Sequence, residues 1–247
     1  RVSRRVLLQL EGVRAKAGSY PCVLGPRVVG ILAHEALGHL AEADLTLNSA
    51  FAGKIGEKVA SEGVYMVDNP KEEFFGTSKY DDEGVKMRKV EIISDGVLKG
   101  LLTNREYAQK TSLKAIGASR AEDWRVPPLI RMRSTYFEKG DYSLDELFER
   151  IDFGYYCVDF RGGQAELSSS FQIGVQEVFE ISKGEISKPV KDLSISGIAT
   201  EALKLIEGVS SEMDFEQGRC GKGQEAFVTS GGPHLMVKKG GIIFGGR

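Results

Sequence analysis

The chain has 247 residues, of which 41% are hydrophobic and 28% charged, and its formal net charge is −2. This length and composition suit one large or two small globular domains, and the near-neutral, mixed charge excludes an extended basic surface for nucleic acid. No apolar run is long enough for a transmembrane helix, and three cysteines do not make a disulfide framework. We therefore expect a protein of a reducing compartment such as the cytoplasm, with no membrane or nucleic-acid partner.

The first predicted elements are an extended segment over residues 2–10 and a helix from Pro26 to about residue 45. Proline suits the first helical turn, where its missing N–H is not needed. An apolar stripe at helical spacing follows it: Val29, Leu32, Ala33, Ala36, Leu37 and Leu40.

Strands are predicted for most of the remaining chain. An apolar run at 64–67 comes first. Two strands, 88–94 and 97–103, then flank Asp95-Gly96, which is typical of a type I′ hairpin turn. A second predicted hairpin joins the segments 172–182 and 185–190 through Lys183-Gly184.

Two further helices are expected before the chain returns to strand. Ser143 and Glu146 form a capping box for a short helix that ends near residue 151, and residues 197–207 also read as helical. The predicted fold class is therefore α+β, a single domain over 1–247 with a mainly antiparallel sheet, one active-site helix and a few further helices.

Residues 34–39 read His-Glu-Ala-Leu-Gly-His, one residue longer than the H-E-x-x-H signature of zinc proteases. A metallohydrolase needs metal ligands, an open position for water and a base, and His34, His39 and Glu35 offer these groups. On a regular helix five residues leave the two imidazoles about 140° apart, so they cannot share a metal. A π-type widening near Ala36–Gly38, eased by Gly38, would bring them together.

Alternatives to this ligand pair stay open at the level of sequence. On a regular helix Glu35 and His39, four residues apart, would be the pair, and Glu42 and Asp44 could add oxygen ligands. The motif can also occur by chance on a helix that binds no metal.

Cys220 stands out among the candidates for a third ligand, which are Cys22, Cys157, Cys220 and His234. It lies in a glycine-rich turn between Arg219 and Lys222, and neighbouring cations favour the thiolate that binds metal. It could instead be an unligated thiol, or a nucleophile paired with a histidine. We expect Cys22 and Cys157 to be packing residues, and His234 to be a surface or backbone-bonding histidine.

These residues together resemble the TldD/PmbA family, and its TldD branch in particular. The resemblance continues in the family's order through four further blocks: Asp81-Asp82-Glu83-Gly84, Asp95 to Gly100, Gly162-Gly163-Gln164, and Cys220-Gly221-Lys222 with Gln224. It implies a zinc-dependent peptidase that acts on unfolded or short peptides, including the maturation of modified peptides. It also implies Zn²⁺ ligands His34, His39 and Cys220, with Glu35 as the general base.

The family also provides expectations about partners. PmbA-like subunits lack the metal residues, so the resemblance places this chain on the catalytic side of a homodimer or of a heterodimer with such a subunit. TldD proteins carry an additional N-terminal domain of similar size. The sequence has no counterpart of that domain, so we expect the C-terminal catalytic half, as a fragment or as a natural short form.

A further family-like block covers residues 130–136, where Arg131, Arg133 and Thr135 alternate along an expected strand. One face of that strand could present cations to a peptide carboxylate, or it could simply be solvated. The family usually has Asn where this chain has Ser134. A sheet edge near the metal could also receive a peptide as an added strand. Two functions compete with the peptidase: a non-catalytic peptide-binding or regulatory module, and a cysteine hydrolase that uses Cys220.

Overall fold

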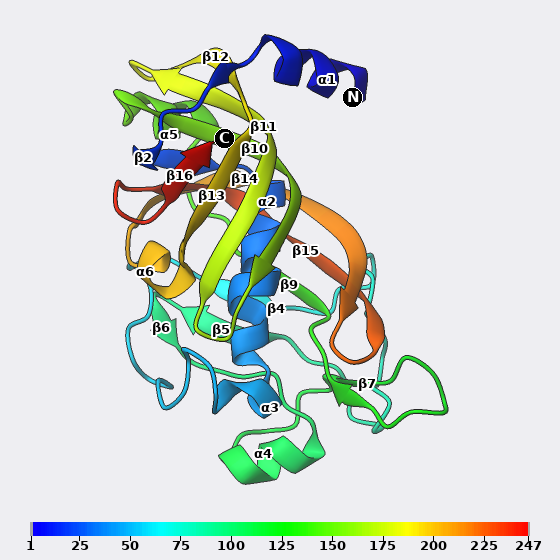
Figure 1. Ribbon diagram of the computed structural model, residues 1–247. Helices are drawn as coiled ribbons and strands as arrows, with labels where there is room; N and C mark the ends of the chain where they lie inside the picture. The colour runs from blue at the N-terminus through cyan, green and yellow to red at the C-terminus, as the bar shows by residue number, and fades with distance from the viewer. Residues whose placement is uncertain (1, 247) are drawn as a thin grey trace.

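A large, curved and mainly antiparallel sheet dominates the computed structural model, which describes residues 2–246 (Figure 1). Its strands follow the order β2-β16-β13-β11-β10-β3-β15-β9-β4-β5-β6, with β1, β12 and β14 attached beside this path. The strands are β1 Val13–Arg14, β2 Gly18–Ser19, β3 Cys22–Leu24, β4 Met66–Asp68, β5 Val90–Ser94, β6 Val97–Leu98, β7 Ser119–Arg120, β8 Leu129–Ile130, β9 Ser134–Phe137, β10 Phe153–Ala165, β11 Ser170–Ser182, β12 Glu185–Lys191, β13 Leu193–Ile198, β14 Ile206–Gly221, β15 Glu225–Val237 and β16 Ile243–Gly246. The predicted α+β class is confirmed.

One helical run passes through the middle of the molecule and is embraced by the sheet (Figure 1). It packs against β10, β14, β15 and β9, and its apolar residues are almost fully buried, as the stripe in the sequence predicts. The helical segments are α1 Val2–Glu11, α2 Pro26–Ile31, a π-helical segment Leu32–Gly38 (η1), a 3₁₀ turn His39–Ala41 (η2), α3 Ala43–Thr46, α4 Arg105–Thr111, α5 Leu144–Glu149 and α6 Ala199–Leu203. None of the described helices is long and apolar enough to cross a membrane.

Local turn chemistry predicts several elements correctly. Asp95 and Gly96 both have positive φ (49° and 75°), as a type I′ turn requires, and they join β5 to β6. Lys183 and Gly184 have φ of 53° and 80° and join β11 to β12. Both hydrogen bonds of the capping box at Ser143 are present, and α5 follows it.

Three predicted elements are wrong in type or length. Residues 2–10 are helical, and Arg5 anchors this helix to Glu177 of β11. The helix predicted over 197–207 forms but is shorter: α6 covers only Ala199–Leu203, because β13 pairs with β11 up to Ile198 and β14 begins at Ile206. The strand predicted over 97–103 ends at Leu98, beyond which the chain bonds to η2 through Leu102 N–H and Ala41 O.

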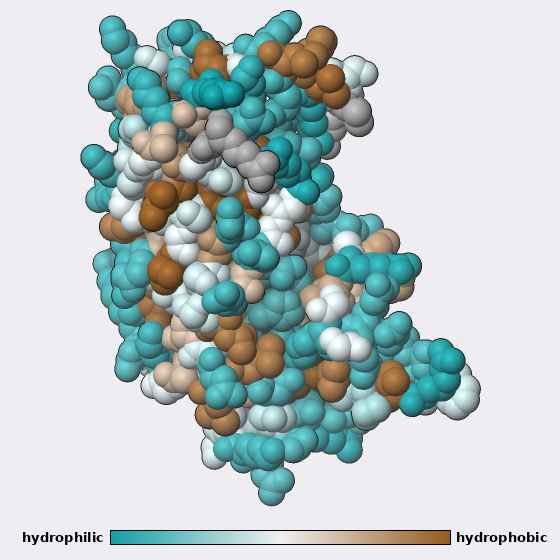
Figure 2. All heavy atoms as spheres, viewed as in Figure 1, coloured by the Kyte–Doolittle hydropathy of each residue, from teal (hydrophilic) through white to brown (hydrophobic). Residues whose placement is uncertain are grey.

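Most of the face in Figure 2 is hydrophilic, with hydrophobic groups scattered over it and one set of them at the top right, over α1. The exposed apolar side chains of α1 are Val6, Leu7 and Leu10, each more than half exposed. Arg5 and Gln9 bond to β11 and hold α1 to the sheet, so Val6, Leu7 and Leu10 face outward.

Candidate metal centre

The π-helical segment brings the two histidines of the motif together. The backbone N–H of His39 donates to the carbonyl oxygen of His34, five residues earlier. It also donates to the carbonyl oxygen of Leu37. The two imidazole rings lie 5.3 Å apart between centroids and nearly perpendicular. The predicted π-type widening is confirmed, and the regular helix on which a Glu35–His39 ligand pair depended does not form.

The hairpin of β14 and β15 delivers Cys220 to these histidines. The potential ligand atoms of His34, His39 and Cys220 all lie within 4.8 Å of one another, and Cys220 Sγ is 3.5 Å from His39 Nε2. The sequence places Cys220 in a turn. In the structure it is the buried penultimate residue of β14, and the turn follows two residues later.

The other candidates for a third ligand lie away from this group. Cys22 and Cys157 are fully buried on the adjacent strands β3 and β10, as expected of packing residues, and burial raises the pKa of both thiols. His234 is buried and its ring bonds to the Tyr156 hydroxyl and to Ser210, so the expected surface or backbone-bonding histidine is wrong.

His34 supplies the structural test of whether a metal fits. Its side chain is 4% exposed, yet neither ring nitrogen has a hydrogen-bond partner among the described residues. Burial, together with the nearby His39 and Arg131, lowers its pKa to about 3, so the imidazole is neutral at pH 7. A buried imidazole without partners is costly, and a metal ion would satisfy it.

His39 is oriented by Glu42, whose side chain is completely buried. Glu42 Oε2 lies 2.7 Å from His39 Nδ1, which leaves Nε2 facing Cys220. Burial acts to lower the pKa of His39, but the bonds to Cys220 and Glu42 outweigh it and raise the pKa to about 10. A carboxylate on the far nitrogen of a ligating histidine is a common feature of zinc sites.

Glu42 and Asp44, which the sequence offered as extra oxygen ligands, are engaged elsewhere. Glu42 holds His39 from behind, and Asp44 pairs with Lys222 Nζ at 2.9 Å. Glu35 is the accessible carboxylate beside the cluster: its side chain is 38% exposed and Oε2 is 3.7 Å from His39 Nε2. Two imidazoles and one thiolate are a donor set that zinc accepts, with a fourth position for water or substrate.

Arg131, Arg133 and Thr135 occupy a different environment from the strand face predicted for them. All three are buried, and the predicted single strand does not form: Arg131 and Arg133 lie between β8 and β9, and Thr135 lies in β9. Arg133 donates to Asp68 and to the carbonyl oxygens of Ile116, Gly117 and Arg88, and Thr135 donates to Asp68. A solvated cationic face does not form here.

Arg131 and Lys222 are the residues whose relation to the site the sequence did not predict. Arg131 donates to the carbonyl oxygens of Cys220 and Gln224, and Lys222 Nζ lies 3.3 Å from Glu42 Oε2. The available signal for Lys222 was its place two residues after Cys220 in a glycine-rich stretch.

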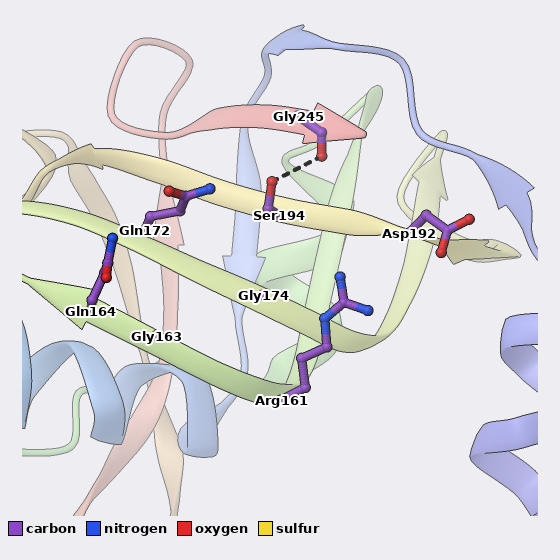
Figure 3. Close-up of a pocket in the computed structure, with 8 residues that line it drawn as sticks. All are labelled: Arg161, Gly163, Gln164, Gln172, Gly174, Asp192, Ser194 and Gly245. Atoms are coloured by element: carbon purple, nitrogen blue, oxygen red, sulfur yellow. Dashed lines mark hydrogen bonds between the residues drawn. The ribbon is translucent and has the colours of Figure 1, made fainter. Parts of the chain in front are cut away.

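A hollow of about 800 Å³ lies elsewhere, across β10, β11, β13 and β16 (Figure 3). Three glycines line it, and Arg161 and Asp192 lie toward the end away from Gln164 and Gln172. Its lining includes no residue of η1 or β14, so the hollow is separate from the cluster of two histidines and a cysteine.

Together, the fold and this cluster define a class: α+β proteins in which a sheet embraces a helix that carries a candidate metal centre of two histidines and a cysteine. Residues 17–243 match the model of the family described as PmbA/TldA metallopeptidase C-terminal domain. The chain therefore belongs to that family, and the resemblance seen in the sequence is confirmed.

Named relatives agree with this assignment. A protein of Saccharolobus solfataricus named zinc metalloprotease TldD homolog is 42% identical over 241 residues, which cover 96% of this chain and 54% of the relative. A Methanothermobacter thermautotrophicus protein named metalloprotease is also 42% identical, over 96% of this chain and 53% of its own length. The chain thus spans about half the length of the curated relatives it matches.

A solved structure has the same architecture. The crystal structure of TldE from Thermococcus kodakarensis matches with a TM-score of 0.78 at 25% sequence identity, over 98% of this chain and 54% of that one. The fold described above is therefore that of half of a longer known chain.

Proposed function

We propose that this chain is the catalytic domain of a zinc-dependent peptidase that hydrolyses unfolded or short peptides, in peptide degradation or maturation. The observation that carries the proposal is the convergence of His34, His39 and Cys220 beside the accessible carboxylate of Glu35. The names of the relatives, zinc metalloprotease and metalloprotease, support the same reaction class.

His34, His39 and Cys220 would hold the zinc ion. When bound, the metal supplies a Lewis acid for the scissile carbonyl and the attacking water. Glu35 takes the proton from that water at its carboxylate oxygen and then delivers it to the nitrogen of the leaving amine. Glu42, by bonding to Nδ1 of His39, keeps Nε2 of that ring directed at the site.

The position of β14 supports the capture of an extended peptide. Among the described strands β14 pairs only with β15. Residues 140–142 bond to its other edge at Ser210, near its start, whereas Cys220 lies at its far end. A peptide that adds as a strand is held through its backbone, which suits an enzyme for unfolded chains of varied sequence. Contacts from Arg131, Arg133 or Thr135 to such a peptide stay a prediction.

We also propose the setting in which the domain works. The likeness to TldE supports assembly as a homodimer or with a PmbA-like subunit. All three cysteines are unpaired, which accords with a reducing compartment, the cytoplasm. In this proposal residues 1–247 form one domain of the C-terminal, catalytic type.

Replacing Glu35 with Gln tests the reaction. Glu35→Gln keeps the three ligand side chains and removes the base, so zinc content should be unchanged while cleavage of an unstructured peptide, followed by mass spectrometry, is lost. Glu106→Gln, an exposed carboxylate on α4, is the matched control and should keep full activity. Turnover by Glu35→Gln at the wild-type rate would refute the mechanism.

Two other functions compete with the peptidase. One is a peptide-binding or regulatory module, and peptide binding without cleavage by zinc-loaded protein would support that function. The 3.5 Å approach of Cys220 Sγ to His39 Nε2 favours a cysteine hydrolase. Activity that alkylation abolishes and chelators leave intact would support the hydrolase.

A further inference from the structure

Cys220 lies at the end of a long hairpin, a place that by itself does not fix a ligand well. The last ladder pairs of the hairpin are Cys220 with Ala226 and Gly221 with Glu225, and Gly223 turns the chain with φ of 70°. Hairpin tips are usually the most mobile part of a sheet. A thiolate that shares a metal with two residues of a buried helix needs its position fixed to a fraction of an ångström.

Arg131 binds the end of β14 and the turn that follows it. Its Nη2 donates to the carbonyl oxygen of Cys220 at 2.5 Å, and its Nη1 donates to that of Gln224 at 2.6 Å. The side chain is 1% exposed, so no water competes for these bonds. The planar fork of guanidinium fixes two acceptors at once, which the single ammonium of lysine cannot do.

Lys222 attaches the same tip to the helix that carries the histidines. Its Nζ lies 2.9 Å from Asp44 Oδ2 and 3.3 Å from Glu42 Oε2. Glu42 is the residue that orients His39, so one carboxylate connects both sides of the centre. The Lys222 side chain is 17% exposed and Glu42 is fully buried, so these charges are only partly screened.

On the basis of the proposed metal centre, we propose that Arg131 and Lys222 form a two-point clamp that sets Cys220 Sγ in position for the metal. Arg131 acts on the backbone of Cys220, and Lys222 acts through Asp44 and Glu42. Both are positioning residues, because neither has a side-chain contact with a ligand atom among the described interactions. Arg131 is thereby assigned a role that differs from contact with a peptide carboxylate.

Four substitutions distinguish the two hydrogen bonds of Arg131 from the effect of its positive charge and from a loss of fold stability. Arg131→Lys keeps the positive charge near His34 but removes the fork. Arg133→Lys makes the same change in a second buried arginine. Its side chain bonds to the Asp68 carboxylate and to the carbonyl oxygen of Gly117, away from the hairpin tip. Lys222→Met removes the second contact at a partly exposed position, and Lys222→Arg restores a cation there.

Zinc affinity, measured by competition with a chromophoric chelator, is the first readout. We expect Arg131→Lys and Lys222→Met to weaken zinc binding about 10- to 100-fold, as loss of supporting contacts does at other metal sites. Lys222→Arg should recover most of the loss, and Arg133→Lys should bind zinc as the wild type does. In cobalt-loaded protein, the thiolate-to-metal absorption band should weaken in the two clamp variants, toward that of Cys220→Ser.

The second readout needs no metal and no activity. In metal-free protein, iodoacetamide should alkylate Cys220 about 10-fold faster in both clamp variants than in Arg133→Lys, because a released tip exposes the thiol. Wild-type zinc affinity and unchanged alkylation in Arg131→Lys and Lys222→Met would overturn the clamp while leaving the peptidase intact. Failure of the wild type to bind zinc would instead overturn the metal centre.

Discussion

The backbone N–H of His39 bonds to the carbonyl oxygen of His34, a reach of five residues where a regular α-helix reaches four. The wider turn places the two imidazoles 5.3 Å apart, on the side of the helix that Cys220 approaches. The extra residue between the histidines, relative to H-E-x-x-H, is therefore matched by an extra residue in the helical turn. The longer histidine spacing therefore suits a π-helical turn and not a regular α-helix.

Gly38 closes this segment for a packing reason rather than for backbone freedom. Its φ is −62°, which any residue adopts, but an added Cβ would overlap Met132 Sδ and lie 2.9 Å from Ala33 O. We predict that Gly38→Ala lowers the free energy of unfolding by about 1–3 kcal/mol, measured by urea titration, and weakens zinc binding. Gly218→Ala, where an added Cβ meets nothing within 4 Å, is the control. Equal stability of the two variants would contradict the packing argument.

Zinc should stabilise the fold through Cys220. A ligand that binds only the native state at about 1,000 times its dissociation constant adds about 4 kcal/mol, so zinc should raise the melting temperature and a chelator should reverse the rise. Cys220→Ser keeps the size of the side chain but removes the thiolate, and its melting temperature should respond much less. Thermal unfolding with and without metal checks this, and an identical zinc response in both proteins would exclude Cys220 as a ligand.

Sequence reasoning succeeded where the cause is local. The turns at Asp95-Gly96 and Lys183-Gly184 depend on backbone conformation within two residues, and the π segment covers seven consecutive residues. Cys220 meets His39 across 181 positions through the pairing of β14 with β15, which no local pattern fixes.

The burial of Arg131 and Arg133 could not be predicted from the sequence either. In the sequence, the alternation of Arg131 and Arg133 is also typical of a solvated strand face. The carbonyl oxygens that accept from these side chains belong to other segments of the chain, which no local pattern predicts. At residues 2–10 the helix depends on an ion pair between Arg5 and Glu177, 172 positions away.

The pair of Asp68 and Arg133 should be structural. Both side chains are fully buried, and Asp68 accepts from Arg133 Nε, from its backbone N–H and from Thr135. We predict that Asp68→Asn costs about 3–5 kcal/mol of unfolding free energy, because it leaves a buried cation without its counter-charge. The double variant Asp68→Leu/Arg133→Met should lose less than the sum of its single changes, as chemical denaturation would show. Additive losses would mean that the two side chains act independently.

His234 should make the fold sensitive to acid. Burial lowers its pKa to about 4, and its ring bonds to the Tyr156 hydroxyl at 3.0 Å. The unfolded chain binds a proton near pH 6.5, whereas the folded chain does so only near pH 4. The stabilisation is therefore complete above about pH 6.5 and lost as the pH falls toward 4, by up to about 3 kcal/mol.

The contribution of His234 must be distinguished from that of His34, whose lowered pKa also makes the fold less stable in acid. Comparison of the wild type with a His234 variant does this. His234→Gln keeps a hydrogen-bonding side chain of similar length that does not titrate. The unfolding free energy of the wild type minus that of His234→Gln, measured by urea titration from pH 8 to pH 4, should fall as the pH falls, while His34 contributes equally to both. A difference that stays constant with pH would show that His234 is protonated as readily in the folded protein as in the unfolded chain.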